Sequence, residues 1–248
     1  MSIEVTILIP LFNEEDTVAE AIRRSTNGLA RTGRTGEVVI VDDGSTDASR
    51  ERVLQQSSRA GVEVRLIRHT RNRGVAAALR TGIENSRGNM IVILPADLES
   101  NPDEDIPRLL ESMSGTDLVS GWRQGRTGSK IVASRVYNFL YRSVLRVDIH
   151  DANWIKFFRK PVADHLIWTK DWNRYMILFA ARAGFRIREV KVTYYKRQHG
   201  SSKFGIKRLP IGFVSFLKIY HEVSKRAKMD GHSTRGSSPP STGEANDT

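Results

Sequence analysis

Short apolar runs alternate with helical patterns along the first 120 residues of the chain. Four runs rich in β-branched residues have the length and continuous apolar character of strands buried in a parallel sheet, and they occupy residues 5–10, 38–42, 64–68 and 90–94. The segments between them repeat apolar residues at helical spacing, at residues 14–30, 47–59 and 74–86. Such a series of strand–helix units predicts an α/β fold with a Rossmann-like, mostly parallel open sheet and flanking helices.

The pattern changes after a fifth predicted strand at residues 117–121. The next predicted elements are an amphipathic helix at 129–147, a strand at 154–158, a helix at 175–183 and a strand at 187–195. An apolar stripe at helical spacing, beside several cations, then consists of Leu209, Phe213, Phe216, Leu217 and Tyr220. We therefore expect four parts, which are residues 1–121, residues 122–207, an amphipathic helix at 208–228 and a disordered Ser/Gly/Pro-rich tail at 229–248.

Polar residues gather where three of the predicted strands end. The segments concerned are "PLFNEE" at residues 10–15, "VDDGSTD" at 41–47 and "LPADLES" at 94–100. Ligands of open α/β sheets bind at the carboxyl ends of the strands, because those ends meet at one edge. We therefore expect the three segments to converge on one site.

Positive charge is concentrated in the second half of the chain. The net charge is +11, and residues 186–228 contain 12 Lys and Arg against two Glu. Residues 121–160 contain nine Lys and Arg against two Asp. This segregation favours an anionic partner over an ordinary solvated surface, and the candidates are a nucleic acid, an anionic lipid and a phosphorylated substrate.

Composition removes several classes of function. The chain has no cysteine, which excludes disulfides, thiolate zinc sites and thiol catalysis. It contains neither G-x-G-x-x-G nor a Walker P-loop, its histidines lack zinc-binding spacing, and no nucleic-acid motif accompanies the basic residues. No apolar stretch approaches the roughly 20 residues of a membrane-spanning helix, so we expect a soluble or peripheral protein that does not bind nucleic acid.

Two adjacent carboxylates, Asp42 and Asp43, follow the second predicted strand. Carboxylates at this position can accept hydrogen bonds from a ribose or a base edge, and adjacent acids repel each other without such a partner. We therefore interpret both as ligand-binding residues. Two nearby residues have simpler interpretations, since Asp47 can cap the next helix and Gly44 can turn the chain.

Asp97 and Glu99 are candidate metal ligands after the fourth strand. In an extended segment, residues two apart share a face, so both carboxylates can reach one hard cation such as Mg²⁺ or Mn²⁺. Such an ion would bridge to a nucleotide diphosphate and neutralise the leaving group. We expect the acids that follow to have a structural role, because Asn101 can cap a helix that has Pro102 at its first position.

The loop "RQHGSSKFG" at residues 197–205 has the composition of an anion-binding loop. It contains two glycines, two hydroxyl groups and the cations Arg197 and Lys203. Such a loop can fold over an anion and donate many hydrogen bonds to it. A flexible basic loop without a ligand is the alternative interpretation.

Taken in order, these segments resemble the family 2 glycosyltransferases of the GT-A fold, in the branch of dolichyl- and polyprenyl-phosphate sugar synthases. "IPLFNEE" is similar to the P-x-Y-N-E opening of the family, and "VDDGSTD" matches the family's motif. "NRGVAAALRTGIENSRGN" resembles the approach to the metal motif, and "GWRQGR", "ASRVYN" and "RQHGSSKFG" resemble segments around the phosphates. The resemblance extends over residues 5–209 and therefore implies an inverting glycosyltransferase.

The resemblance also implies roles for individual residues. The nucleotide-sugar donor would be bound by Pro10, Asn13, Glu14, Asp42, Asp43, Asp97 and Arg123. The metal would be held by Asp97 and Glu99, and Asp97 and Arg123 would be catalytic. The phosphate of the polyprenyl acceptor would be bound by Lys130, Ser134, Arg197, Ser202 and Lys203. Residues 1–121 would be the donor half and 122–207 the acceptor half, and the amphipathic helices would lie on the anionic inner face of the cell membrane.

The chain departs from the family pattern at two places. "PAD" replaces D-A-D, so that Pro95 stands where a third carboxylate could be, and "DANWIKFF" retains only Asp151 of another motif. Two alternatives therefore remain beside the polyprenyl-phosphate synthase. One is a family 2 transferase with a glycan or other hydroxyl acceptor, and the other is a non-catalytic relative that binds an anion or a nucleotide.

Overall fold

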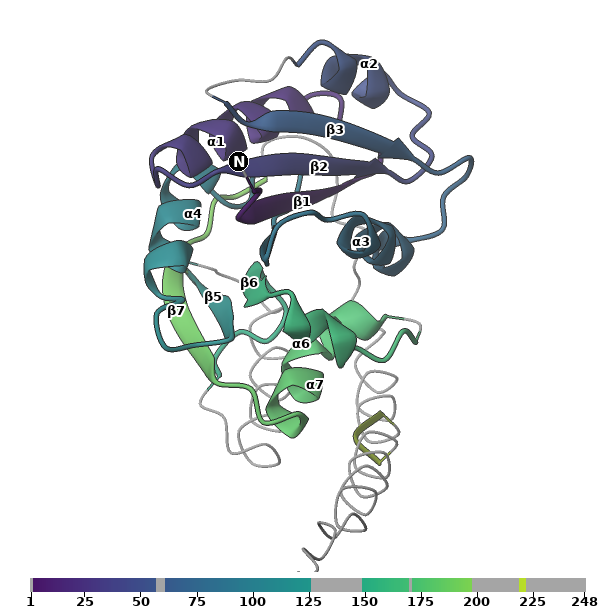
Figure 1. Cartoon of the computed structure of the whole chain (residues 1–248). Coiled ribbons are helices and arrows are strands. Elements are labelled where there is room, and N and C mark those ends of the chain that lie inside the picture. Colours follow the sequence, from purple (N-terminus) through teal and green to yellow (C-terminus); the bar gives the residue numbers. More distant parts are fainter. Residues whose placement is uncertain (1, 57–60, 126–148, 170, 198–218, 222–248) are drawn as a thin grey trace, which may run out of the picture.

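One mixed sheet of seven strands, in the order β3-β2-β1-β4-β6-β5-β7, forms the centre of the molecule (Figure 1). The computed structural model describes residues 2–56, 61–125, 149–169, 171–197 and 219–221. The strands are β1 (Val5–Leu11), β2 (Gly36–Asp42), β3 (Glu63–Arg68), β4 (Met90–Ile93), β5 (Leu118–Gln124), β6 (Lys156–Arg159) and β7 (Ile187–Thr193). The helices are α1 (Val18–Ala30), α2 (Ser49–Leu54), α3 (Val75–Glu84), α4 (Pro102–Glu111), α6 (Pro161–Asp164), α7 (Met176–Arg182) and the 3₁₀ helix η1 (Trp172–Arg174).

The sheet is parallel except at β6. Strands β3, β2, β1 and β4 pair in parallel, and so do β5 and β7. Strand β6 lies between β4 and β5 and runs antiparallel to both. The carboxyl ends of β1, β2, β4 and β5 therefore meet at one edge, together with the beginning of β6. This confirms the predicted α/β class and the mostly parallel sheet.

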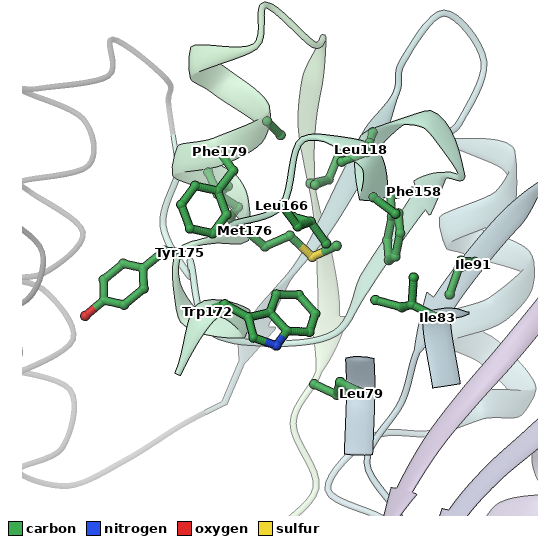
Figure 2. Close-up of a cluster of buried hydrophobic side chains, with 14 of the residues drawn as sticks. Leu79, Ile83, Ile91, Leu118, Phe158, Leu166, Trp172, Tyr175, Met176 and Phe179 are labelled. Atoms are coloured by element: carbon green, nitrogen blue, oxygen red, sulfur yellow. The ribbon is translucent and has the colours of Figure 1, made fainter. Parts of the chain in front are cut away.

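Alternating side chains of the strands feed two hydrophobic clusters, one on each face of the sheet. Ile7 and Ile9 of β1 belong to one cluster, which α1, α2 and α4 complete, whereas Leu8 belongs to the other. The second cluster contains side chains of α3, α6, η1 and α7, and Figure 2 shows how Trp172 lies among them. Burial on both faces explains why β1 and β2 read as nearly continuous apolar runs.

Glycine permits the close approach of α1 and α4. A Cβ atom on Gly28 would lie 2.3 Å from the backbone oxygen of Pro102, the first residue of α4. Only a residue without a side chain fits there. This contact fixes the start of α4, and with it the polar segment that connects β4 to α4.

The structure corrects several predicted boundaries. Helix α1 begins at Val18, four residues after the predicted start, because Glu14 and Glu15 belong to the polar turn after β1. Helix α2 ends at Leu54 rather than at residue 59, and β5 continues to Gln124 rather than ending at residue 121. Asn101 precedes α4 and Pro102 occupies its first turn, as predicted, but the Asn101 side chain does not cap the helix. Its backbone N–H instead donates to Asp105 Oδ2 at 3.0 Å.

Two predicted helices fall largely outside the described residues, namely those at 129–147 and 208–228. Within the second, residues 219–221 are helical, and Ile219 and Tyr220 pack against the cluster that contains α7. The Arg182 guanidinium carbon lies 4.4 Å from the centre of the Tyr220 ring. The Tyr220 ring therefore lies against the protein. Among the described residues, no helix is long and apolar enough to cross a membrane.

Candidate active site

The polar segments after β1 and β2 interlock through hydrogen bonds. Asn13 has a φ of +54°, a conformation in which asparagine is more readily accepted than most residues. Its backbone N–H donates to Ser45 Oγ at 3.1 Å, and its Oδ1 accepts the Thr46 N–H at 2.9 Å. The Glu14 N–H donates to Ser49 Oγ at 2.8 Å. The predicted convergence of these two strand ends is therefore confirmed, and the side chain of Asn13 helps to build the junction.

Asp47 connects the same two segments. Its Oδ1 accepts the Ser49 N–H at 3.0 Å, in the first turn of α2, and its Oδ2 accepts the Glu15 N–H at 3.2 Å. The structural role predicted for Asp47 is confirmed, although the residue directly before α2 is Ala48.

Asp42 is fully buried and has one oxygen without a hydrogen bond. Its Oδ1 accepts the Ser45 N–H at 2.8 Å. Its Oδ2 has no hydrogen-bond partner within the described residues, and Arg68 Nε is 3.9 Å away, beyond hydrogen-bond range. A buried carboxylate oxygen in this state is costly, and a donor group on a ligand would satisfy it.

Asp43 is engaged in a different way. Its Oδ1 lies 2.6 Å from His69 Nδ1 and accepts the Arg73 N–H at 3.0 Å, while its Oδ2 accepts the Gly74 N–H at 2.7 Å. The other ring nitrogen of His69 lies 3.0 Å from Thr81 Oγ1. Asp43 thus fixes the turn before α3, which positions the wall of the site. Sequence reasoning did not single out His69, and a histidine directly after a predicted strand was the available signal.

The segment after β4 bends instead of remaining extended. The Leu94 N–H still donates to Leu8 of β1 at 3.0 Å, and the strand pairing ends at Pro95, as a residue without an N–H requires. Leu98 then has a φ of +57°, and Asp97 Oδ1 accepts the Glu99 N–H at 3.1 Å. This corrects the assumption that Asp97 and Glu99 share a face through the alternation of an extended segment.

Arg197 brings the third strand end to the other two. Its Nη2 forms an ion pair with Glu14 Oε1, and its Nη1 lies 3.7 Å from Asp97 Oδ2. Burial opposes the charge of Arg197, but the hydrogen bond and attraction of Glu14, with attraction from Asp97 and Glu99, outweigh it and raise the pKa of the guanidinium. Arg197, predicted to bind the acceptor, is thus placed beside residues predicted to bind the donor and the metal.

Backbone contacts fix the approach of Arg197. The Tyr194 N–H donates to the Gln124 oxygen at the end of β5, and the Tyr195 N–H donates to the Glu99 oxygen, both at 3.0 Å. The chain after β7 therefore runs along the bend at residues 97–99. Lys130, Ser134, Ser202 and Lys203, the other predicted acceptor residues, lie outside the described residues.

Arg123 is held by Asp151 in a bidentate pair. Its Nε and Nη2 donate to the two carboxylate oxygens at 2.6 and 2.9 Å, and its guanidinium carbon lies 4.4 Å from the centre of the Trp154 ring. Its Nη1 makes no hydrogen bond within the part of the chain that the structure describes, so this nitrogen can still serve a diphosphate. The motif residue Asp151 therefore orients Arg123.

Lys156 is a buried cation that sequence reasoning missed. It is 4% exposed at the start of β6, and its Nζ donates to the Trp154 oxygen at 3.0 Å. Burial lowers the pKa of Lys156 to about 8, against the opposing effect of Asp151, and Arg123 lowers it further. The signal was a lysine within the apolar run "WIKFF".

The carboxylates of the site suit a metal that a ligand completes. No group of three or more His, Asp or Glu residues within the described ranges is arranged to hold an ion. Asp97 and Glu99 nevertheless supply hard oxygen donors, and Mg²⁺ is commonly held by one or two carboxylates together with substrate phosphates. The donor set therefore fits Mg²⁺ or Mn²⁺ bound jointly with a diphosphate.

Sequence comparison places these features in a known family. Residues 6–168 match the family described as Glycosyl transferase family 2. The chain is 31% identical over 239 residues to a dodecaprenyl-phosphate galacturonate synthase of Rhizobium johnstonii, covering 93% of this chain and 70% of that protein. It is 33% identical over 209 residues to an undecaprenyl-phosphate 4-deoxy-4-formamido-L-arabinose transferase of Pseudomonas paraeruginosa, covering 83% of this chain and 61% of that one.

Solved structures show the same fold. Glucosyl-3-phosphoglycerate synthase of Mycobacterium tuberculosis, with Mn²⁺, uridine diphosphate and glucosyl-3-phosphoglycerate, superposes with a TM-score of 0.63 at 16% identity, over 80% of this chain and 73% of that one. The same enzyme with Mg²⁺ and uridine diphosphate gives a TM-score of 0.61 at 17% identity, over 80% of this chain and 72% of that one. This likeness confirms the predicted GT-A type of fold.

Proposed function

Because the chain belongs to glycosyl transferase family 2, we propose that it transfers a sugar from a nucleotide diphosphate to the phosphate of a polyprenyl lipid. The observation that carries this proposal is the meeting of Glu14, Asp97 and Arg197, which joins the proposed donor and acceptor segments at one edge of the sheet. Two relatives whose names describe transfer to dodecaprenyl or undecaprenyl phosphate support the lipid acceptor.

The donor lies across the ends of β1 and β2 in this proposal. Pro10, Asn13 and Glu14 border it from β1, and Asp42 and Asp43 border it from β2. Asp42 Oδ2, which is buried without a hydrogen bond within the described residues, accepts a hydrogen bond from the nucleoside. Asp43 acts through the turn that it fixes before α3.

Asp97 and Glu99 would hold Mg²⁺ or Mn²⁺ when the donor diphosphate is bound. The ion, when bound, neutralises charge that develops on the leaving diphosphate. Arg123 assists from the other side through its Nη1, while Asp151 keeps the guanidinium oriented. Asp97 and Arg123 are thus the catalytic residues of this proposal.

The acceptor needs no general base. A phosphate monoester has a second pKa near ~6, so it is largely a dianion at neutral pH. One of its oxygens attacks the anomeric carbon, the bond from that carbon to the diphosphate oxygen breaks, and the configuration inverts as the nucleoside diphosphate leaves. Lys130, Ser134, Arg197, Ser202 and Lys203 hold the acceptor phosphate, and catalysis rests on alignment and charge stabilisation.

The basic second half of the chain supports a location of this reaction at the inner face of the cell membrane. Residues 186–228 carry 12 Lys and Arg against two Glu, and cations near an anionic surface contribute about 1 kcal/mol each. The chain would therefore bind as a peripheral protein to the surface that presents its lipid substrate.

The test is a panel of nucleotide sugars, each incubated with the purified chain, undecaprenyl phosphate and Mn²⁺, and read by mass spectrometry. We expect one sugar phosphate ester of the lipid, and we expect Asp97→Asn to abolish its formation. A parallel set with undecaprenol and with simple glycans offers hydroxyl acceptors only. Transfer to those hydroxyls without transfer to the lipid phosphate would contradict the proposal.

A further inference from the structure

Arg197 lies among the carboxylates that the proposed function gives to the donor and the metal. The ion pair with Glu14 and the 3.7 Å approach to Asp97 place one guanidinium between the ends of β1 and β4. All three side chains are largely shielded from water, with exposures of 21% for Arg197 and 18% for Glu14 and Asp97. Attraction within such a partly buried group is screened less than on an open surface.

The two oxygens of Asp97 are not equivalent. Oδ1 accepts the backbone N–H of Glu99 at 3.1 Å, whereas Oδ2 faces the Arg197 guanidinium. A divalent cation bound by Asp97 would use Oδ2 most directly, because Oδ1 is already engaged. The metal and Arg197 would then place two positive centres at the same oxygen, which is unfavourable.

The backbone keeps Arg197 near this oxygen even when its side chain moves. The Tyr195 N–H is bonded to the Glu99 oxygen, so residue 197 begins two residues from a fixed point. The flexible arginine side chain can therefore turn from the carboxylates toward a neighbouring phosphate without a change in the sheet.

We propose that Arg197 is an internal counter-ion that competes with the metal for the donor carboxylates. Without a ligand it neutralises Glu14 and Asp97. The metal, together with the donor diphosphate, displaces it, and the released guanidinium then binds the acceptor phosphate. This inference rests on the proposed function, since it takes Asp97 as a metal ligand.

The test measures Mn²⁺ affinity by electron paramagnetic resonance, without nucleotide or lipid, in the wild type, Arg197→Gln and Arg197→Met. We expect both variants to bind Mn²⁺ at least about tenfold more tightly than the wild type. The matched control is Arg34→Gln, which also removes one cation and leaves one carboxylate, that of Glu4, without its partner at 2.6 Å. Arg34 lies at the amino ends of the strands, so the Mn²⁺ affinity of Arg34→Gln should equal that of the wild type.

A further variant, Arg197→Gln combined with Asp97→Asn, should lose the increase in Mn²⁺ affinity. Equal affinity in the wild type and both Arg197 variants would overturn the inference, and so would a gain that persists without Asp97 or that Arg34→Gln reproduces. Circular dichroism confirms that each variant is folded. The Mn²⁺ measurement uses no substrate, so its result does not depend on whether the proposed transfer reaction is observed. If the enzyme is active but the Arg197 variants bind Mn²⁺ no more tightly, only the counter-ion inference is overturned.

Discussion

Two adjacent carboxylates, Asp42 and Asp43, end the same strand but serve different purposes. Asp42 retains an oxygen without a hydrogen bond within the described residues, whereas Asp43 is saturated by His69 and two backbone N–H groups. Adjacent residues of an extended segment point in different directions, so one carboxylate can bind a ligand while the next supports the turn. In this pair, Asp42 is therefore available to a ligand, whereas Asp43 holds the turn before α3.

Replacing His69 should destabilise the protein through Asp43. In His69→Ala the buried carboxylate loses one of its three donors, and hydrogen bonds to charged groups contribute about 1.5–3 kcal/mol. We expect the free energy of unfolding in urea to fall by about 2 kcal/mol and nucleotide affinity to weaken as the turn before α3 loosens. Arg73→Ala is the control, because Arg73 contacts Asp43 through its backbone and should change the free energy by less than about 0.5 kcal/mol. Equal losses in both variants would contradict this role.

Removing Arg123 should destabilise the fold in addition to any effect on catalysis. The pair with Asp151 has side-chain exposures of 11% and 5%, so Arg123→Ala leaves a buried carboxylate without its cation. Breaking such a pair costs about 3–5 kcal/mol, and we expect a loss of that order in urea unfolding. In the double variant with Asp151→Asn the losses should not add. Additive losses would show that the two side chains act independently.

At the scale of the elements, the apolar pattern of the sequence predicted the strands well. It did not predict the conformation of the polar segments that follow them. Strands β1 to β4 were predicted within two residues at each end, because short runs rich in β-branched residues are distinctive even where, as in β3, the strand is only partly buried. The bend at Leu98 was not predicted, since leucine rarely adopts positive φ, although Asp97, whose Oδ1 accepts the Glu99 N–H, is of a type that favours such turns. The approach of Arg197 to Glu14 joins residues 183 positions apart, and only the folded sheet brings them together.

Helix α4 carries a pH-dependent feature at its start. Asp105 is 2% exposed, and burial raises its pKa from 3.8 to about 7. The unfolded chain therefore loses this proton at lower pH than the folded chain does. The protonated Asp105 contributes its full share to the free energy of unfolding below about pH 4, and that contribution is lost as the pH rises toward 7. Between pH 4.5 and 7.5 the free energy of unfolding should decrease in both proteins, and the decrease should be smaller in Asp105→Asn. We expect the difference between the two decreases to be about 2–4 kcal/mol. Urea titrations at several pH values test this, and parallel pH profiles for the two proteins would contradict it.

At the scale of the whole molecule, the uneven charge predicts binding to anionic membranes. We expect the chain to sediment with anionic vesicles at low salt and to dissociate at high salt, since the Debye length falls from about 30 Å at 0.01 M to about 3 Å at 1 M. Replacing Lys207, Arg208 and Lys218 with Gln should lower partitioning more than about tenfold, at about 1 kcal/mol per cation.

The matched control for this measurement removes the same charge from residues 1–121, at Arg34, Arg50 and Arg52. Partitioning of that variant should stay within about threefold of the wild type, because those cations lie outside the basic segment. Equal binding to neutral and anionic vesicles at low salt would show that electrostatic attraction does not drive the association.

The position of β6 limits how such enzymes can be recombined. A crossover at residue 121 is meant to divide the proposed donor half from the proposed acceptor half. However, β6 comes from beyond residue 121 and pairs with β4 and with residues 118–120 of β5, which come from before it. A chimaera would inherit Ile91 and Leu118 from one parent and their neighbour Phe158 from the other. Mismatched volumes at that seam would cost core packing. Specificity in this architecture should therefore be transplanted as loops, with the strands kept from a single parent.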